Sequence, residues 1–159
     1  MSLSQTVEEI STRVTAICDD LAGLEGPLLP ILHEVQETWG FIPEGALQTI
    51  AKKLNLSRAE VHGVASFYHD FRHNAPGRHV IKICRAEACQ AMGGDAIANQ
   101  AQRKLGIGWS ETTPDQSVTL EPVYCLGLCA CAPAAMVDGK LVARLDNDRL
   151  DRMIKEVRS

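Results

Sequence analysis

The chain has few aromatic residues, no basic run and no long apolar stretch. Aromatic residues make up 4% of the 159 positions, so we expect a core built mainly from leucine, isoleucine, valine and alanine. The net charge is −4, and this argues against nucleic-acid binding, because phosphate neutralisation needs a positive surface. No stretch approaches the roughly 20 apolar residues of a membrane span, so we expect no membrane insertion.

Motifs for nucleotide binding and hydrolysis are missing as well. The sequence has neither a G-x-G-x-x-G pattern nor a P-loop, and therefore offers no phosphate-binding loop of its own for NAD, FMN or ATP. His33 and Glu34 begin like a metalloprotease motif, but Glu37 stands where the second histidine is needed. We expect no substrate chemistry in this chain alone.

The start of the chain bears on how its six cysteines are interpreted. Residues 1–10 have neither the positive segment nor the apolar segment of a secretory signal peptide, so we expect a cytoplasmic protein. In that reducing compartment, cysteines indicate metal or redox chemistry more often than disulfides.

Apolar residues recur at three- and four-residue spacing through the first half and predict a helical bundle in a first domain, residues 1–75. We expect helices over residues 7–21, 28–39, 43–54 and 57 to about 71. Ser57 and Glu60 have the spacing of a capping box at the start of the fourth. Turn-forming residues at 73–77 mark the domain boundary.

The second half, residues 78–159, has the pattern of a small α/β domain, so the predicted fold class is α+β. We expect strands at 80–83 and 117–120 and a helix from Gly93-Gly94 to residue 105. Asp138-Gly139 predicts a hairpin, and Asp146 is placed to cap a last helix.

Four cysteines form two pairs that each follow a predicted strand. Cys84 and Cys89 have C-x₄-C spacing, and Cys125 and Cys129 have C-x₃-C spacing. Structural zinc is usually held by tighter C-x₂-C loops, and redox dithiols use C-x-x-C. A [2Fe–2S] cluster takes two ligands on each iron, and the wider loops suit it. The spacing favours the cluster and leaves zinc as the alternative.

Nearby residues fit a negatively charged cluster. Gly127 allows close approach of the backbone, and a helix beginning at Gly94 would turn its positive end toward Cys89. Glu87 runs against this trend, so we expect it to point to solvent. Outside the pairs, Cys131 is expected to be a small buried residue rather than a ligand.

The remaining candidates have simple structural interpretations. Cys18 is expected to pack on the first helix. Phe67, Tyr68 and Phe71 are expected to pack in the core or between the domains, with a docking surface as the alternative. Residues 69–73 include two histidines four positions apart, which we interpret as a polar helix end rather than a metal site.

Residues 80–89 and 125–133 resemble thioredoxin-like [2Fe–2S] ferredoxins, in particular the 24-kDa-type subunit of NADH:quinone oxidoreductase and its relatives. Residues 29–36, 40–43 and 61–68 resemble the helical region that precedes the cluster domain in that family. The resemblance implies a thioredoxin-like α/β domain with a [2Fe–2S] cluster held by the four cysteines Cys84, Cys89, Cys125 and Cys129.

One segment narrows the resemblance. Respiratory members usually carry a Thr-Pro-like sequence in the first cysteine loop, whereas this chain has Arg-Ala-Glu-Ala at 85–88. Together with residues 90–93, 62–63 and 130–133, this loop is more similar to the gamma subunit of NAD-reducing, molybdenum-dependent formate dehydrogenases. This implies one-electron exchange with a partner subunit that binds FMN and NAD, in a complex with a molybdenum and iron–sulfur subunit. Respiratory NADH:quinone oxidoreductase and NAD-reducing hydrogenase stay open as hosts. A zinc-stabilised thioredoxin-like interaction module is the alternative of another class.

Overall fold

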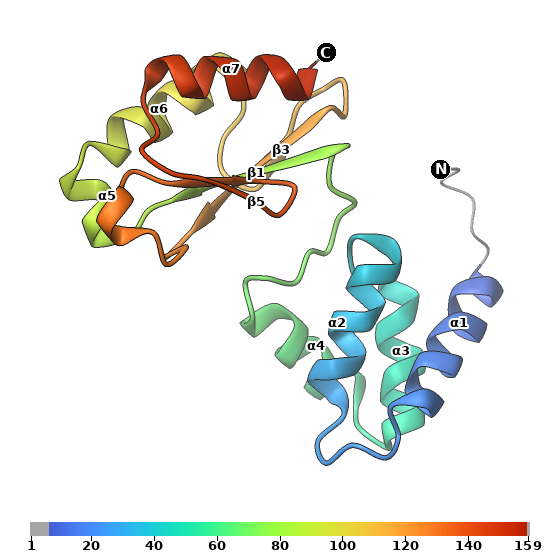
Figure 1. Cartoon of the computed structure of the whole chain (residues 1–159). Coiled ribbons are helices and arrows are strands. Elements are labelled where there is room, and N and C mark those ends of the chain that lie inside the picture. The colour runs from blue at the N-terminus through green and yellow to red at the C-terminus, as the bar shows by residue number, and fades with distance from the viewer. Residues whose placement is uncertain (1–6, 159) are drawn as a thin grey trace. The chain divides into compact units, whose positions relative to one another are not determined.

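The computed structural model describes residues 7–158. The chain divides into two compact units on either side of the Ala75–Pro76 bond (Figure 1). Each unit has its own apolar core. Residues 1–6 and 159 lie outside the described part. Most of the segment on which the signal-peptide prediction depends is therefore not described.

The described part of the first unit, residues 7–75, contains four helices, as predicted: α1 (Val7–Asp20), α2 (Leu28–Trp39), α3 (Glu44–Leu54) and α4 (Arg58–Phe67). The capping box at the start of α4 is confirmed, because Glu60 N donates to Ser57 Oγ at 3.2 Å and Ser57 N donates to Glu60 Oε2 at 2.8 Å. Apolar side chains at helical spacing meet in one core, and its fully buried members include Val14, Ile31, Leu32, Val35, Ile50 and Val61.

The end of α4 differs from the prediction. The helix stops at Phe67, and Tyr68 has extended backbone, with φ −86° and ψ 110°. Phe71 is 5% exposed in the helical core, with its ring centroid 4.9 Å from that of His33. Phe67 is 73% exposed, so it is wrong to count it in the core of this unit.

The second unit is built on a mixed sheet with the strand order β2-β3-β1-β4-β5. Its strands are β1 (His79–Cys84), β2 (Glu111–Thr112), β3 (Val118–Val123), β4 (Ala135–Val137) and β5 (Lys140–Val142). Strand β1 pairs parallel with β3 and antiparallel with β4. The structure is therefore α+β, as predicted.

Up to residue 158, this unit also contains three helices and one 3-10 turn: α5 (Glu87–Ala91), α6 (Gly94–Leu105), α7 (Asn147–Arg158) and η1 (Cys129–Cys131). Helices α6 and α7 lie on the same face of the sheet in Figure 1 and share one core with it. That core includes Ile81, Ile83, Ile97, Val118, Leu120, Leu150 and Ile154.

Local signals in the sequence fix several ends of these elements. Asp138 and Gly139 have φ values of 47° and 81°, as a tight primed hairpin between β4 and β5 requires. Asp146 Oδ1 accepts the N–H of Arg149 at 2.8 Å and caps α7, as predicted.

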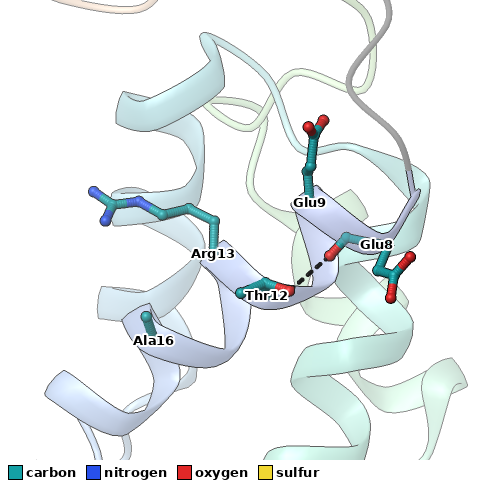
Figure 2. Close-up of a pocket in the computed structure, with 5 residues that line it drawn as sticks. All are labelled: Glu8, Glu9, Thr12, Arg13 and Ala16. Carbon is teal, nitrogen blue, oxygen red and sulfur yellow. Dashed lines mark hydrogen bonds between the residues drawn. The ribbon is translucent and has the colours of Figure 1, made fainter.

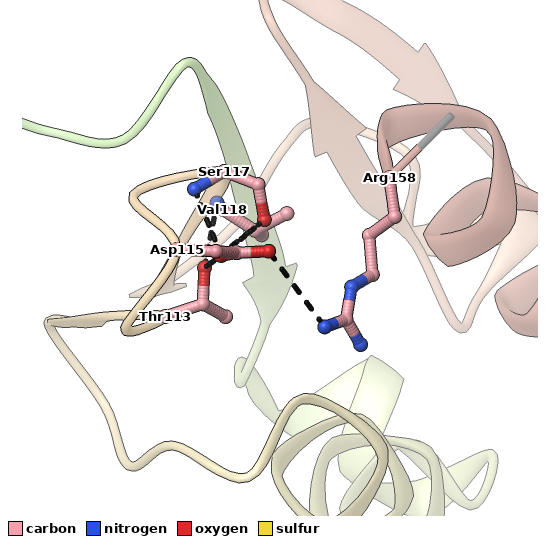
Figure 3. A network of polar contacts seen from close by, with 5 residues as sticks. All are labelled: Thr113, Asp115, Ser117, Val118 and Arg158. Atoms are coloured by element: carbon pink, nitrogen blue, oxygen red, sulfur yellow. Dashed lines mark hydrogen bonds and ion pairs between the residues drawn. The ribbon is translucent and has the colours of Figure 1, made fainter.

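The turn before β3 is organised by one carboxylate, shown in Figure 3. Asp115 Oδ1 accepts from Thr113 Oγ1 at 2.5 Å, Ser117 Oγ at 2.7 Å and Ser117 N at 3.1 Å. Arg158 Nη2 of α7 lies 3.8 Å from Asp115 Oδ2. The hydrogen bonds from Thr113 and Ser117 hold the pKa of Asp115 well below its usual range. The carboxylate therefore ties the start of β3 to the end of α7.

Candidate metal centre

The parallel pairing of β1 and β3 brings the two cysteine pairs to the same end of the sheet. Cys84 is the last residue of β1, and its partner across the ladder is Val123, the last residue of β3. Cys125 follows Val123 by two residues. Because the carboxyl ends of parallel strands lie at one edge, the sheet places both pairs side by side.

The two pairs differ sharply in exposure. Cys84 and Cys89 are each 2% exposed and belong to a small apolar cluster with Ala134. Cys125 and Cys129 are exposed, and their sulfurs lie 3.8 Å apart. The site is therefore closed on the side of the first pair and open on the side of the second.

Backbone N–H groups point at the sulfurs. The Cys84 sulfur accepts from the amides of Ala86, Cys125 and Leu126, and Gly127 N lies 3.4 Å from Cys125 Sγ. Cys125 has φ 103° and Gly127 has φ 75°, so left-handed backbone turns the amides of this loop inward. Amide donors of this kind stabilise thiolates that ligate iron.

Interactions within the group separate the thiols in acidity. Burial raises the pKa of Cys84, but the three amides and the Cys89 thiol together lower it below the ordinary value. Burial and the hydrogen bond with Cys84 raise the pKa of Cys89. The contact with Cys125 raises the pKa of Cys129. The protein alone thus favours a thiolate at Cys84 and disfavours one at Cys89 and at Cys129, and a cationic centre would favour the thiolate form of both. Four cysteine sulfurs in two pairs are the type of donor set that an iron–sulfur group takes.

Gly94 lets the first pair pack against α6. A Cβ at this position would lie 2.5 Å from the carbonyl oxygen of Cys89, which is closer than any stable contact. Gly93 precedes it with φ 85° and starts the helix. The helix N-terminus predicted beside Cys89 is confirmed, and Gly94 is required there because no side chain fits.

An ion pair lies next to the buried pair Cys84 and Cys89, and the sequence did not indicate it. Arg85 Nη2 lies 3.0 Å from Asp95 Oδ1, and the guanidinium carbon lies 5.4 Å from the centroid of the Trp109 ring. Arg85 Nε is buried without a hydrogen-bond partner among residues 7–158. The only sequence signal was the position of Arg85 inside the first cysteine loop.

The other predicted residues have mixed outcomes. Glu87 is exposed, as expected. Cys18 is 2% exposed in the helical core, as expected, and this burial raises its pKa. Cys131 lies on η1 and is only half-buried, so the prediction of a buried residue is wrong. Its carbonyl oxygen accepts the N–H of Arg144 at 2.7 Å, which holds the backbone after the second pair.

The other places that could be considered as functional sites are the histidines near the end of α4 and a hollow along α1. His73 stacks on His62, with ring centroids 6.2 Å apart. In the described part of the chain, no three histidine, cysteine, aspartate or glutamate side chains are grouped around a position for one metal ion. A shallow hollow follows one face of α1 (Figure 2), lined by Glu8, Glu9, Thr12, Arg13 and Ala16. Of the helices within residues 7–158, none has the length and apolar character needed to cross a bilayer.

Two thiol pairs, joined by parallel strands and supplied with amide donors, make this a protein of the ferredoxin class. The model of the family described as thioredoxin-like [2Fe-2S] ferredoxin matches residues 14–158, and the chain belongs to that family. Its cofactor is the [2Fe–2S] cluster, as predicted.

Known relatives are subunits of larger enzymes. A subunit of NADH-quinone oxidoreductase from Pseudomonas aeruginosa is 40% identical over 107 residues, which are 67% of this chain and 64% of the relative. The HndA subunit of NADP-reducing hydrogenase from Solidesulfovibrio fructosivorans is 29% identical over 143 residues, which are 90% of this chain and 84% of the relative. A crystal structure of NAD⁺-reducing [NiFe]-hydrogenase in the air-oxidized state matches with a TM-score of 0.70 and 28% identity, over 82% of this chain and 22% of that chain.

The matches cover only part of several of these proteins. The chain spans 64% of the Pseudomonas aeruginosa relative and 52% of a NADH-quinone oxidoreductase subunit from Mycobacterium bovis. The similarity therefore establishes the family and the fold.

Proposed function

We propose that this chain is the electron-transfer subunit of an NAD-linked oxidoreductase and holds one [2Fe–2S] cluster on Cys84, Cys89, Cys125 and Cys129. The observation that carries the proposal is the register of β1 and β3, which sets Cys84 opposite Val123 and so gathers both pairs. When bound, the cluster would supply one-electron chemistry.

The chain's own residues determine how the cluster is held and from which side a partner subunit can approach it. The amides of Ala86, Cys125 and Leu126 stabilise negative charge on the Cys84 sulfur. Burial of Cys84 and Cys89 excludes water from one side. The exposed second pair leaves the other side open to a partner. We expect this partner to be a subunit that binds FMN and NAD.

Anaerobic purification with iron and acid-labile sulfide analysis tests the cluster. We expect two irons and two sulfides per chain and a spin-one-half EPR signal after dithionite reduction. Single changes Cys84→Ser, Cys89→Ser, Cys125→Ser and Cys129→Ser assign the ligands, with Cys131→Ser as the matched control. Stoichiometric zinc in a colourless chain that resists reconstitution would contradict the proposal and favour a zinc-stabilised interaction module.

For the host, we propose a cytoplasmic, molybdenum-containing, NAD-dependent formate dehydrogenase, in which this chain is the gamma subunit. The support is the resemblance of residues 85–88 and 90–93, together with residues 62–63 and 130–133, to that subunit. Affinity purification of the tagged chain from its own cell tests this. Co-purified molybdenum and formate-dependent NAD reduction are expected, whereas formate-independent complexes without molybdenum would contradict the proposal.

A second host is favoured by the named relatives. They include subunits of NADH-quinone oxidoreductases and a subunit of a hydrogenase. Nickel in the purified complex with hydrogen-dependent NAD reduction would indicate a hydrogenase. Quinone reduction in a membrane fraction would indicate a respiratory complex.

We also propose that residues 1–75 and 78–159 are separate domains. Each unit has its own apolar core, which supports independent folding. Expression of residues 78–159 alone tests this: a cooperative thermal transition and normal iron content are expected, and an unfolded fragment would contradict it.

A further inference from the structure

Two charged residues lie next to the groups that hold the buried cysteine pair. Arg85 directly follows Cys84, and its backbone N–H donates to Val123 O at 2.7 Å, so the chain is fixed at this point. Asp95 directly follows Gly94, which packs against the carbonyl of Cys89. Consecutive Cα atoms are about 3.8 Å apart, so the Cα atom of Arg85 lies that close to the Cα atom of Cys84, and the Cα atom of Asp95 lies that close to the Cα atom of Gly94.

The guanidinium of Arg85 is held in place, and its positive charge is only partly neutralised by Asp95. It contacts Asp95 through Nη2 at 3.0 Å and lies over Trp109. Its Nε has no acceptor among residues 7–158. The Arg85 side chain is 27% exposed and that of Asp95 is 54% exposed. Water therefore screens the carboxylate more than the guanidinium, and the positive charge acts more strongly on the interior.

Reduction of an iron–sulfur group adds one negative charge to its surroundings. A fixed positive charge nearby favours the reduced form, and a fixed negative charge favours the oxidised form. We propose that Arg85 and Asp95 are a positioning pair that sets the reduction potential, with Arg85 raising it and Asp95 offsetting part of that rise. This rests on the proposed function, in which Cys84 and Cys89 are ligands.

Opposite shifts from the two partners separate this role from a structural one. If the ion pair only held residue 85 against α6, removing either partner would break the same contact and shift the potential in the same direction. The charge role instead predicts that Arg85→Gln lowers the potential and Asp95→Asn raises it. The double variant should lie between the two.

The matched control is a second ion pair of the same helix. Lys104 Nζ lies 2.5 Å from Asp151 Oδ1, and the two side chains are 36% and 50% exposed, close to the values of the Arg85 pair. Lys104 is nine residues beyond Asp95 on α6, roughly 14 Å along the helix axis. Lys104→Gln and Asp151→Asn should therefore leave the potential unchanged.

The experiment is an EPR-monitored redox titration of the full chain, purified anaerobically, for wild type and these five variants. We expect the ratio of reduced to oxidised cluster at a fixed potential to fall about three- to tenfold for Arg85→Gln and to rise for Asp95→Asn, and tenfold is about 59 mV for one electron. Shifts of the same sign, or none, in variants with full iron content would overturn the inference alone. A wild-type chain without any cluster signal would overturn the proposed function instead.

Discussion

The two cysteine pairs are held by different means. Cys84 ends a central strand and Cys89 lies on the short helix α5, and both are buried. Cys125 and Cys129 flank a loop between β3 and η1, and both are exposed. The core fixes the first pair, whereas the second pair depends on left-handed backbone at Cys125 and Gly127.

This contrast assigns different tasks to the two sides of one site. A buried ligand pair attaches the site to the fold, because any movement of it disturbs packed neighbours. An exposed pair on a loop can adjust when a cofactor or a partner binds. The first pair therefore controls the stability of the site, and the second controls access to it.

Exchange of single ligands is expected to give the largest difference between the pairs. Cys84→Ser should abolish the cluster, since the shorter side chain is held by buried neighbours and cannot move toward iron. Cys129→Ser should keep part of the iron with a changed EPR spectrum, because its loop can adjust. Iron analysis and EPR of anaerobic preparations measure both. Equal losses of iron in the two variants would contradict the proposal that the first pair anchors the cluster and the second controls access to it.

Replacing one glycine beside each cysteine pair is expected to give a smaller difference, in unfolding free energy and iron content. Gly94→Ala places a Cβ 2.5 Å from the Cys89 carbonyl oxygen, so we expect a loss of about 1–3 kcal/mol in unfolding free energy and reduced iron content. Gly127→Ala meets no atom within 4 Å and has only the cost of φ 75°, about 1–2 kcal/mol.

Urea unfolding of both variants measures these costs, and Gly45→Ala on α3, also without a neighbour within 4 Å, is the control. If Gly94→Ala were as stable as that control, the close packing of α6 against Cys89 would be disproved.

Thiol labelling sharpens the comparison without any substitution. In folded, metal-free chain, a maleimide should modify Cys125 and Cys129 before Cys84 and Cys89, because only the second pair is exposed. Mass spectrometry after timed quenching gives the order. In denatured chain the preference should vanish. Simultaneous labelling in the folded chain would show that the first pair is not protected.

The smallest effect is expected at Asp115, which supports β3 at the end remote from Cys125. Its pKa is lowered by the hydrogen bonds from Thr113 and Ser117. A lowered carboxyl pKa adds stability above the unfolded-state value of about 3.9, and this stability is lost as the pH falls toward the folded-state value.

Asp115→Asn should therefore lower Tm near neutral pH, with a deficit that shrinks below about pH 4. Thermal melts across this range measure it. Iron content should not change, because the ligands are untouched. A deficit independent of pH would mean that the carboxylate charge has no part in holding the turn.

Much of the architecture was predictable because it depends on local signals. The capping box at Ser57 and Glu60, the hairpin at Asp138 and the cap at Asp146 each need only a few adjacent residues. The clustering of the cysteines was predictable from their places after two strands, once these strands pair in parallel.

Features that depend on distant contacts were not predictable. Helix α5 has five residues, too few to show an apolar period, and β2 has only two. The unequal burial of the cysteine pairs follows from which chain segments pack around each one. The contacts of Arg85 with Asp95 and Trp109 join residues that are 10 and 24 positions away. Phe67 is exposed because it lies on the side of α4 away from the buried residues Val61 and Ala65.

The crossover from β1 to β3 also has a consequence for biogenesis. The first cysteine pair lies at the start of this crossover and the second pair follows β3, so no short continuous segment contains all four thiols. Iron that reaches a nascent chain before the two strands have paired meets at most two of them together. Parallel pairing is a late, non-local event in folding. Insertion of the cofactor should therefore not precede the pairing of β1 with β3, and the colour of the protein should report that these two strands have come together.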